Sequence, residues 1–240
     1  MPSPLVIRQD GEVWSFTLAR PEKRNALSAD LVDALLEGVQ EAHRNGASVL
    51  AFRGEGRSFS AGFDFSDVDS QSEGDLLLRF VRIEMLLQAI ANSPCVTVGM
   101  AQGRNFGAGV DLLAVCRQRY ATNDASFRMP GLKFGLVLGT RRFGAIVGQA
   151  EARRILESSL TFDAEEAKRL GFVTEIREAN NWDAAIDAAR ETAALLDHPS
   201  RMALHAALSP KQDEADLAAL TLSAARAGLK KRIAQYLGQG

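Results

Sequence analysis

The sequence predicts an α/β fold, and three observations support this prediction. Residues 5–9 and 13–18 are short strand-like runs joined by Asp10-Gly11, a pattern typical of a β-hairpin. Residues 28–46 then show the periodicity of an amphipathic helix, and residues 49–52 form another short apolar run. This strand–helix–strand order, followed by mostly helical patterns after residue 140, indicates helices packed on a sheet.

The elements of the first half follow from capping residues and periodicity. Ser28 is suited to cap the first helix, and Asn45-Gly46 is suited to end it. Residues 67–74 lack apolar periodicity, which predicts a surface loop. Residues 76–90 repeat apolar side chains at spacings of three and four, which predicts a second amphipathic helix that ends at Ser93-Pro94.

The second half continues with short strands and then becomes helical. Strands are expected over residues 95–100, 117–121, 126–129 and 172–176, and helices over 149–157, 163–170, 181–196, 201–208 and 213–237, with His198-Pro199 as a break. We expect residues 1–197 to form the α/β core. Residues 198–240 form a helical region too short for a core of its own, so we expect it to pack on the main body or on a neighbouring subunit.

Composition excludes several classes of protein. The net charge of −2 leaves no basic excess to neutralise phosphates, so we expect no nucleic-acid partner. Cys95 and Cys116 both lie in apolar runs, which favours buried thiols over a disulfide. The three histidines (His43, His198 and His205) have no partner at metal-ligand spacing, so we expect no metal. With no leader pattern at the start and no apolar run of roughly 20 residues, we expect no membrane span and a cytoplasmic location.

Two glycine turns are the candidate site. Residues 57–67 and 103–111 each follow an apolar run that reads as a buried strand, and each is expected to lead into a helix. The first N–H groups of a helix have no intrahelical partner and lie at the positive end of its dipole. Two such turns facing each other could bind one oxygen that carries negative charge, for example the oxygen of a thioester.

The residues of these turns belong to a longer series of motifs. RPEKRNALS, GEGRSFSAGFDF, GRNFGAGVDLLAVCRQRYA, LGTRRFGAIVG and FDAEEAKRLGFVTEI occur in this order. Together they resemble the enoyl-CoA hydratase/isomerase family, also called the crotonase family. The resemblance implies a ClpP/crotonase-type spiral of ββα units with a helical C-terminal region used in trimer formation. It also implies an acyl-CoA substrate, whose coenzyme A is part of the thioester, with no prosthetic group, and a homotrimer or a dimer of trimers.

The resemblance assigns the two turns to an oxyanion hole. The residue after the AG dipeptide, here Phe63, would donate one backbone N–H to the thioester oxygen. The middle residue of a GGG-type triplet, here Ala108, would donate the other. Since both donors are backbone groups, the side chains at these positions do not change the chemistry.

The resemblance also suggests where coenzyme A binds. The family places it against the RPEKRNAL loop and the AGFDF turn, and the matching positions are Arg24, Ala26, Ala61, Asp64 and Phe65. A guanidinium near the phosphates is physically reasonable because arginine supplies a charge and several donors.

The acids depart from the pattern of a hydratase. Family hydratases use two glutamates, and the first position here is Asp111, which keeps a carboxylate on a shorter side chain. The second follows Pro130 and is Gly131, which has no acid or base. We therefore expect isomerase-like or other non-hydratase chemistry, with Asp111 as the only acid or base. The alternatives are an acyl-CoA hydrolase, a decarboxylase, or a non-catalytic member that binds acyl-CoA.

Overall fold

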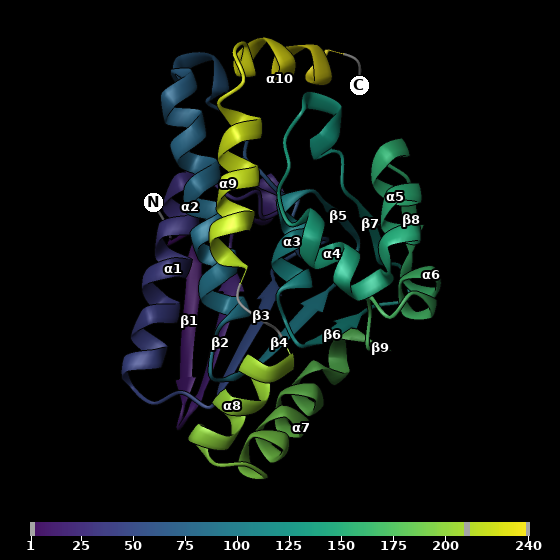
Figure 1. The fold of residues 1–240 in the computed structure, drawn as a ribbon. Helices are drawn as coiled ribbons and strands as arrows, with labels where there is room; N and C mark the ends of the chain where they lie inside the picture. Colours follow the sequence, from purple (N-terminus) through teal and green to yellow (C-terminus); the bar gives the residue numbers. More distant parts are fainter. Residues whose placement is uncertain (1–2, 209–211, 239–240) are drawn as a thin grey trace.

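The computed structural model describes residues 3–208 and 212–238, and it shows two sheets surrounded by helices (Figure 1). A six-stranded sheet has the order β1-β2-β3-β4-β6-β9, and a small three-stranded sheet has the order β5-β7-β8. The strands are β1 Leu5–Asp10, β2 Val13–Leu18, β3 Val49–Gly54, β4 Val96–Ala101, β5 Arg104–Phe106, β6 Gln118–Ala121, β7 Ser126–Arg128, β8 Thr161–Asp163 and β9 Glu175–Ile176.

The helices occupy most of the remaining chain. They are α1 Ala29–Arg44, α2 Glu73–Ala91, α3 Ala108–Ala114, α4 Thr140–Val147, α5 Gln149–Ser158, α6 Ala164–Arg169, α7 Trp182–Ala194, α8 His198–Leu208, α9 Asp213–Ala224 and α10 Leu229–Leu237. Four short 3₁₀ helices, η1 Pro21–Lys23, η2 Val68–Ser70, η3 Gly131–Phe134 and η4 Ala179–Asn181, lie in the loops.

The large sheet begins with the predicted hairpin. β1 and β2 are antiparallel, with Asp10 opposite Val13 across the turn. β2, β3, β4, β6 and β9 then pair in parallel. Because the carboxyl ends of parallel strands meet at one edge, the loops after β3 and β4 lie next to each other. These loops contain the two glycine turns.

Alternate residues of the central strands face opposite layers, as the pleat requires. In β3, Leu50 and Phe52 belong to the core shared with α1 and α2, whereas Val49 and Ala51 belong to the core shared with α7. Trp182 is buried in that second layer. The sheet is therefore covered on both faces, which explains why its strands read as continuous apolar runs rather than alternating ones.

The structure corrects the predicted loop over residues 67–74. η2 occupies part of it, and α2 begins at Glu73 with Ser72 as its N-cap. The Ser72 hydroxyl accepts a hydrogen bond from the Asp75 N–H, and the Asp75 carboxylate accepts one from the Ser72 N–H. This capping box adds a polar first turn to the helix, which apolar periodicity alone does not detect.

The prediction was also wrong in the C-terminal half. The single helix expected over residues 213–237 is two helices, α9 and α10, separated by a turn in which Gly228 has a φ of +79°. His198-Pro199 begins α8 instead of only breaking the chain, since a proline in the first turn of a helix has no N–H bond to lose. The helix α4 and the strands β5 and β8 were not predicted, and the strand expected over 172–176 is confined to β9.

The C-terminal helices pack on the body of the molecule. In Figure 1, α9 runs alongside α2, and α10 crosses the end of the molecule at which α2 begins. Leu220 and Ala224 of α9 and Leu229 and Ile233 of α10 are buried in the main core. The Arg232 guanidinium donates from Nε to the Phe134 carbonyl at 2.9 Å, which fixes α10 beside η3.

Candidate active site

The two glycine turns pack directly against each other. A Cβ on Gly62, whose φ is +80°, would lie 2.3 Å from the Phe106 carbonyl oxygen and 3.2 Å from the Ala108 nitrogen. A Cβ on Gly109 would lie 2.6 Å from the Ser60 carbonyl oxygen. Since no real side chain fits at these distances, glycine is needed for the backbones of the two turns to come this close.

Buried side-chain amides hold this arrangement. The Asn105 side-chain oxygen accepts a bond from the Ser60 N–H at 3.2 Å, and the Ser60 hydroxyl donates to the Asn25 carbonyl at 2.8 Å. The Asn25 amide in turn donates to the Ser58 carbonyl at 2.9 Å. All three side chains are buried, so these bonds link the two turns to the loop before α1 without competition from solvent.

The two predicted N–H donors lie on this junction. Within the described residues, neither the Phe63 N–H nor the Ala108 N–H has a backbone acceptor. Ala108 is the first residue of α3, as expected. Phe63 is not at the start of a helix, which corrects the expectation for the first turn. It lies in a parallel β-bridge with Leu27. The Leu27 N–H donates to the Gly62 carbonyl and the Leu27 carbonyl accepts from the Asp64 N–H, so this bridge leaves the Phe63 N–H unused.

The Phe63 side chain is fixed by α2. Its ring stacks on Phe80 with centroids 4.3 Å apart, and the Arg79 guanidinium lies 4.1 Å from its centroid on the ring face. Arg79 also donates to the Asp64 carbonyl at 2.8 Å. These contacts set the orientation of the backbone on both sides of the Phe63 N–H.

A cavity of about 280 Å³ is lined by Phe63 and Ala108, the two residues that carry these N–H groups. Arg24, Ala61, Gly107, Ala108, Asp111, Pro130, Gly131 and Thr140 contribute to its lining. Its apolar wall is made by Phe63, Phe65, Phe80, Phe106, Met129, Leu132, Phe134, Leu136, Leu138, Leu156, Tyr236 and Leu237. This mixture of apolar walls and a few polar groups is typical of a small-molecule site.

Asp111 is the one acidic residue in the lining, among the residues that the structure describes. It is only 3% exposed, and its Oδ1 is buried with no hydrogen-bond partner in the described part of the chain. That oxygen lies against Gly139, where an added Cβ would be 1.8 Å away. Burial raises the pKa of Asp111 well above the ordinary carboxyl value, although the Arg142 guanidinium lowers it and Glu84 raises it further.

The second acid position has no side chain in the cavity. Gly131 begins η3 directly after Pro130 and lines the cavity as backbone. Glu84 on α2 is another buried acid, but it does not line the cavity. It is 1% exposed, and its carboxylate accepts hydrogen bonds from both terminal nitrogens of Arg142. The cavity therefore offers one titratable carboxyl to a ligand.

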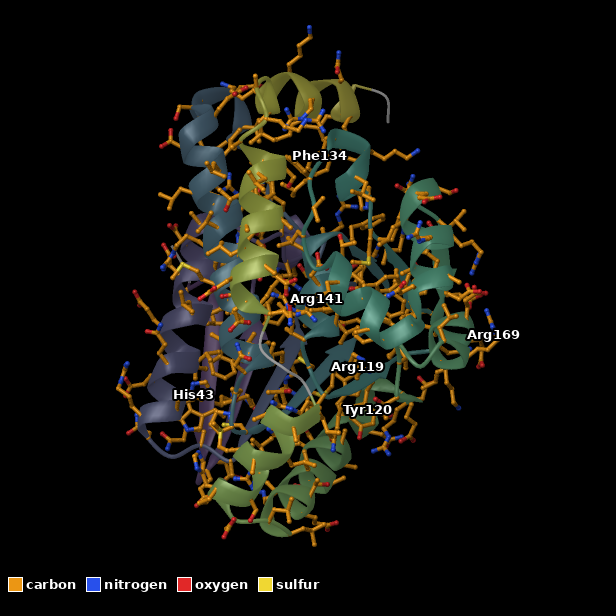
Figure 2. The ribbon with its side chains drawn as sticks, viewed as in Figure 1. His43, Arg119, Tyr120, Phe134, Arg141 and Arg169 are labelled. Carbon is orange, nitrogen blue, oxygen red and sulfur yellow. The ribbon has the colours of Figure 1, made fainter. Side chains whose placement is uncertain are left out.

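A charge cluster that is largely buried, except for Arg141, lies behind Asp111. Arg142 on α4 pairs with Glu84 on α2, and its Nη2 lies 3.3 Å from the Asp216 carboxylate on α9. Arg141 binds Asp216 with two bonds of 2.7 and 2.8 Å, and Figure 2 shows Arg141 where α4 meets α9. The cluster thus joins three helices and fixes the start of α4, against which Asp111 rests.

The predicted coenzyme A positions separate into two groups. Arg24, Ala61 and Phe65 line the cavity. Ala26 and Asp64 do not: Arg20 donates to the Ala26 carbonyl at 2.6 Å and to the Asp64 carboxylate at 2.8 Å. Burial alone would raise the pKa of Asp64, but hydrogen bonds from Ser66 and Arg20 outweigh it and lower that pKa. Coenzyme A contacts stay a prediction for all five residues.

Sequence reasoning missed the part of the wall that comes from distant segments. Tyr236 from α10 packs on Phe134, with centroids 5.3 Å apart, and Figure 2 shows Phe134 beneath that helix. Thr140 and Leu156 come from α4 and α5. Their apolar or neutral side chains have no chemical signature, and only their periodicity could have marked them as buried.

Residues 3–208 and 212–238 show neither a metal site nor a membrane-spanning helix. No group of three or more His, Cys, Asp or Glu side chains there could hold a metal ion. No helix in these ranges is long and apolar enough to cross a membrane.

The chain is similar to known proteins over most of its length. The family model described as enoyl-CoA hydratase/isomerase matches residues 8–235. A Mycobacterium tuberculosis protein named "Probable enoyl-CoA hydratase echA6" is 34% identical over 203 residues, covering 82% of this chain and 80% of that protein. Human ethylmalonyl-CoA decarboxylase is 26% identical over 191 residues, covering 77% of this chain and 62% of that protein.

Solved structures show the same fold. A Bordetella parapertussis crystal structure, described provisionally as an enoyl-CoA hydratase/isomerase, is 59% identical with a TM-score of 0.97 and covers 99% of both chains. Enoyl-CoA hydratase from Bacillus halodurans is 23% identical with a TM-score of 0.84, covering 97% of this chain and 100% of that one. The predicted crotonase-type fold is confirmed.

Proposed function

The chain belongs to the enoyl-CoA hydratase/isomerase family, and we propose that it acts on an acyl-CoA thioester by stabilising an enolate. The observation that supports this proposal concerns Phe63 and Ala108: both residues line one cavity, and the backbone N–H of each lacks a backbone acceptor in the described residues. Preorganised donors of this kind lower the energy of an oxygen that gains charge in the transition state.

Asp111 is the proposed acid and base. In an isomerisation, its carboxylate would remove a proton from the carbon next to the thioester, breaking a C–H bond and placing the electron pair on the thioester oxygen. The same group would return that proton at the γ carbon as the double bond shifts. Burial raises the pKa of Asp111, which makes its carboxylate a stronger base than an exposed one, and the carboxyl group formed in the first step holds the proton that the second step needs.

Hydration by two carboxylates is disfavoured. That mechanism needs a second acid, and the cavity has the backbone of Gly131 where it would stand. A shorter Asp111 resting against Gly139 also leaves its carboxyl group little freedom to reach a distant water.

Exchange with deuterated water tests the proposal directly. We expect the wild-type protein to exchange the α-protons of acyl-CoA esters and to convert 3-enoyl-CoA esters into 2-enoyl-CoA esters. Asp111→Asn, which keeps the shape of the side chain, should lower both rates by about 100-fold or more. Exchange that survives this change would exclude Asp111 as the acid or base.

Decarboxylation is the second candidate. A carboxyl group of raised pKa can donate its proton to the enolate that remains when carbon dioxide leaves, and this needs only one acid. The similarity to ethylmalonyl-CoA decarboxylase motivates the test. Release of carbon dioxide from alkylmalonyl-CoA esters, without double-bond migration, would favour it. Thioester hydrolysis would appear as free coenzyme A, and saturable binding without turnover would favour a non-catalytic member.

The assembly is also proposed. We expect a homotrimer or a dimer of trimers, as the family resemblance implies, and large apolar side chains exposed in and next to the C-terminal region support a subunit contact there. Leu195 is 79% exposed, Leu208 at the end of α8 is 74% exposed and Leu222 on α9 is 74% exposed. Such side chains are usually covered by a partner when they cluster. A monomer mass in solution would refute the expected assembly.

A further inference from the structure

The cavity ends at a thin wall. Leu132, Thr140 and Leu156 line the candidate active site on one side and a separate surface groove on the other. The groove lies along α4 and α5, has a volume of about 480 Å³, and has Gly144, Ala145 and Ala152 among its lining residues. The two spaces therefore adjoin at these three residues, which we call the wall.

The wall lies where the far end of an acyl group would point. Asp111 Oδ1 rests against Gly139, and Thr140 is the next residue along the chain. Arg24, Ala61 and Phe65 approach the cavity from the loops after β2 and β3. A thioester that enters from those loops and presents its reacting carbons to Asp111 thus directs the rest of its acyl chain toward Thr140.

Leu156 is the most buried side chain of this wall. It is only 6% exposed and belongs to the main core, so its position is fixed by packing. Leu132 is 38% exposed in η3 and closes the wall from the solvent side. A chain longer than the cavity would therefore meet these side chains before it reached the groove.

We propose that Leu132, Thr140 and Leu156 set the length of the acyl group, so that the protein selects short and medium acyl-CoA esters whose chain ends at this wall. This inference rests on the proposed function, since it assumes an acyl-CoA ligand with its reacting carbons at Asp111. It concerns binding only, so it can be tested without turnover.

The test compares two leucine truncations of similar burial. Leu156→Ala removes the wall and joins the cavity to the groove. Leu136→Ala is the matched control, because Leu136 is 4% exposed and lines the cavity but not the groove. Affinities are measured by calorimetry for butyryl-, hexanoyl-, octanoyl-, decanoyl-, dodecanoyl- and palmitoyl-CoA, with circular dichroism to check folding.

In the wild-type protein we expect affinity to rise about fourfold for each added methylene that is buried, and then to stop rising when the chain reaches the wall. Leu136→Ala should move that limit by a few methylenes at most. Leu156→Ala should bind palmitoyl-CoA at least about tenfold more tightly than octanoyl-CoA, since each methylene in the groove adds to the buried area. If Leu156→Ala does not fold, Thr140→Ala opens the same wall and is read in the same way.

Two results would overturn the inference: a wild-type protein that already prefers palmitoyl-CoA, or a Leu156→Ala variant whose chain-length profile matches that of Leu136→Ala. A failure of the proposed reaction would give a different result from a failure of the proposed wall. If acyl-CoA esters bind with the expected limit but no exchange occurs at the α carbon, the proposed reaction fails and the wall stands. If no ester binds at all, both fail.

Discussion

Gly62→Ala is the sharpest test of how the two turns form the site. The added methyl group would lie 2.3 Å from the Phe106 carbonyl oxygen and 3.2 Å from the Ala108 nitrogen, so the turns must separate. Alanine at a φ of +80° also costs about 1–2 kcal/mol of backbone strain, and the crowding adds about 1–3 kcal/mol. We therefore expect the free energy of unfolding to fall by about 2–5 kcal/mol.

The effect on activity should be larger than the effect on folding suggests. Separating the turns moves the Phe63 and Ala108 N–H groups out of register with a single oxygen. Loss of one such donor typically lowers kcat by about 100-fold to 1000-fold, equivalent to roughly 3–4 kcal/mol. The assay is deuterium exchange at the α carbon of a bound acyl-CoA ester, measured at a temperature at which circular dichroism shows the variant to be folded.

Gly171→Ala is the matched control. Gly171 has a φ of +73°, but an added Cβ there meets nothing within 4 Å. It should lose about 1–2 kcal/mol of stability through strain alone and keep its exchange rate. A folded Gly62→Ala protein that exchanges within a few-fold of the wild-type rate would refute the idea that this glycine contact aligns the two donors.

Three further changes test other parts of the structure. Burial raises the pKa of the Asp111 carboxyl in the folded protein, so its contribution to stability is present at acidic pH and is lost as pH rises through the raised pKa. The gain in Tm of Asp111→Asn over wild type should therefore grow with pH, and a difference that stays constant would contradict this reasoning. Burial raises the pKa of Cys116 to about 12 and also raises that of Cys95, so neither thiol should react with iodoacetamide at mildly alkaline pH until the protein is unfolded, as mass spectrometry would show. Glu84→Ala should cost about 3–5 kcal/mol in urea unfolding, because it removes the carboxylate that bonds both terminal nitrogens of Arg142 and leaves only Asp216 at 3.3 Å. The double change with Arg142→Met should cost less, and equal losses would argue against a buried ion pair.

Local sequence features predicted the elements whose boundaries depend on neighbouring residues. Asp10-Gly11 marks the β1–β2 hairpin, and Ser28 caps α1 by accepting from the Leu31 N–H at 3.3 Å. The central strands were found because both of their faces are buried, which leaves a continuous apolar run. By contrast, α4 was missed, because its first turn carries Arg141 and Arg142, whose charges are neutralised by residues far away in the sequence.

The sequence by itself determined the fold class, the family and the two glycine turns, because a backbone that comes close to another backbone requires glycine at particular places in the chain. It also determined that, of the two positions at which family hydratases have glutamates, position 111 has a carboxyl group and position 131 has none. Only the tertiary structure decided the environment of that carboxyl: burial against Gly139, the charge cluster behind it, and a cavity closed by Thr140, Leu156 and Tyr236. These depend on contacts between segments that are distant in the sequence, and the side chains that make them have no local pattern that distinguishes a cavity wall from an ordinary core.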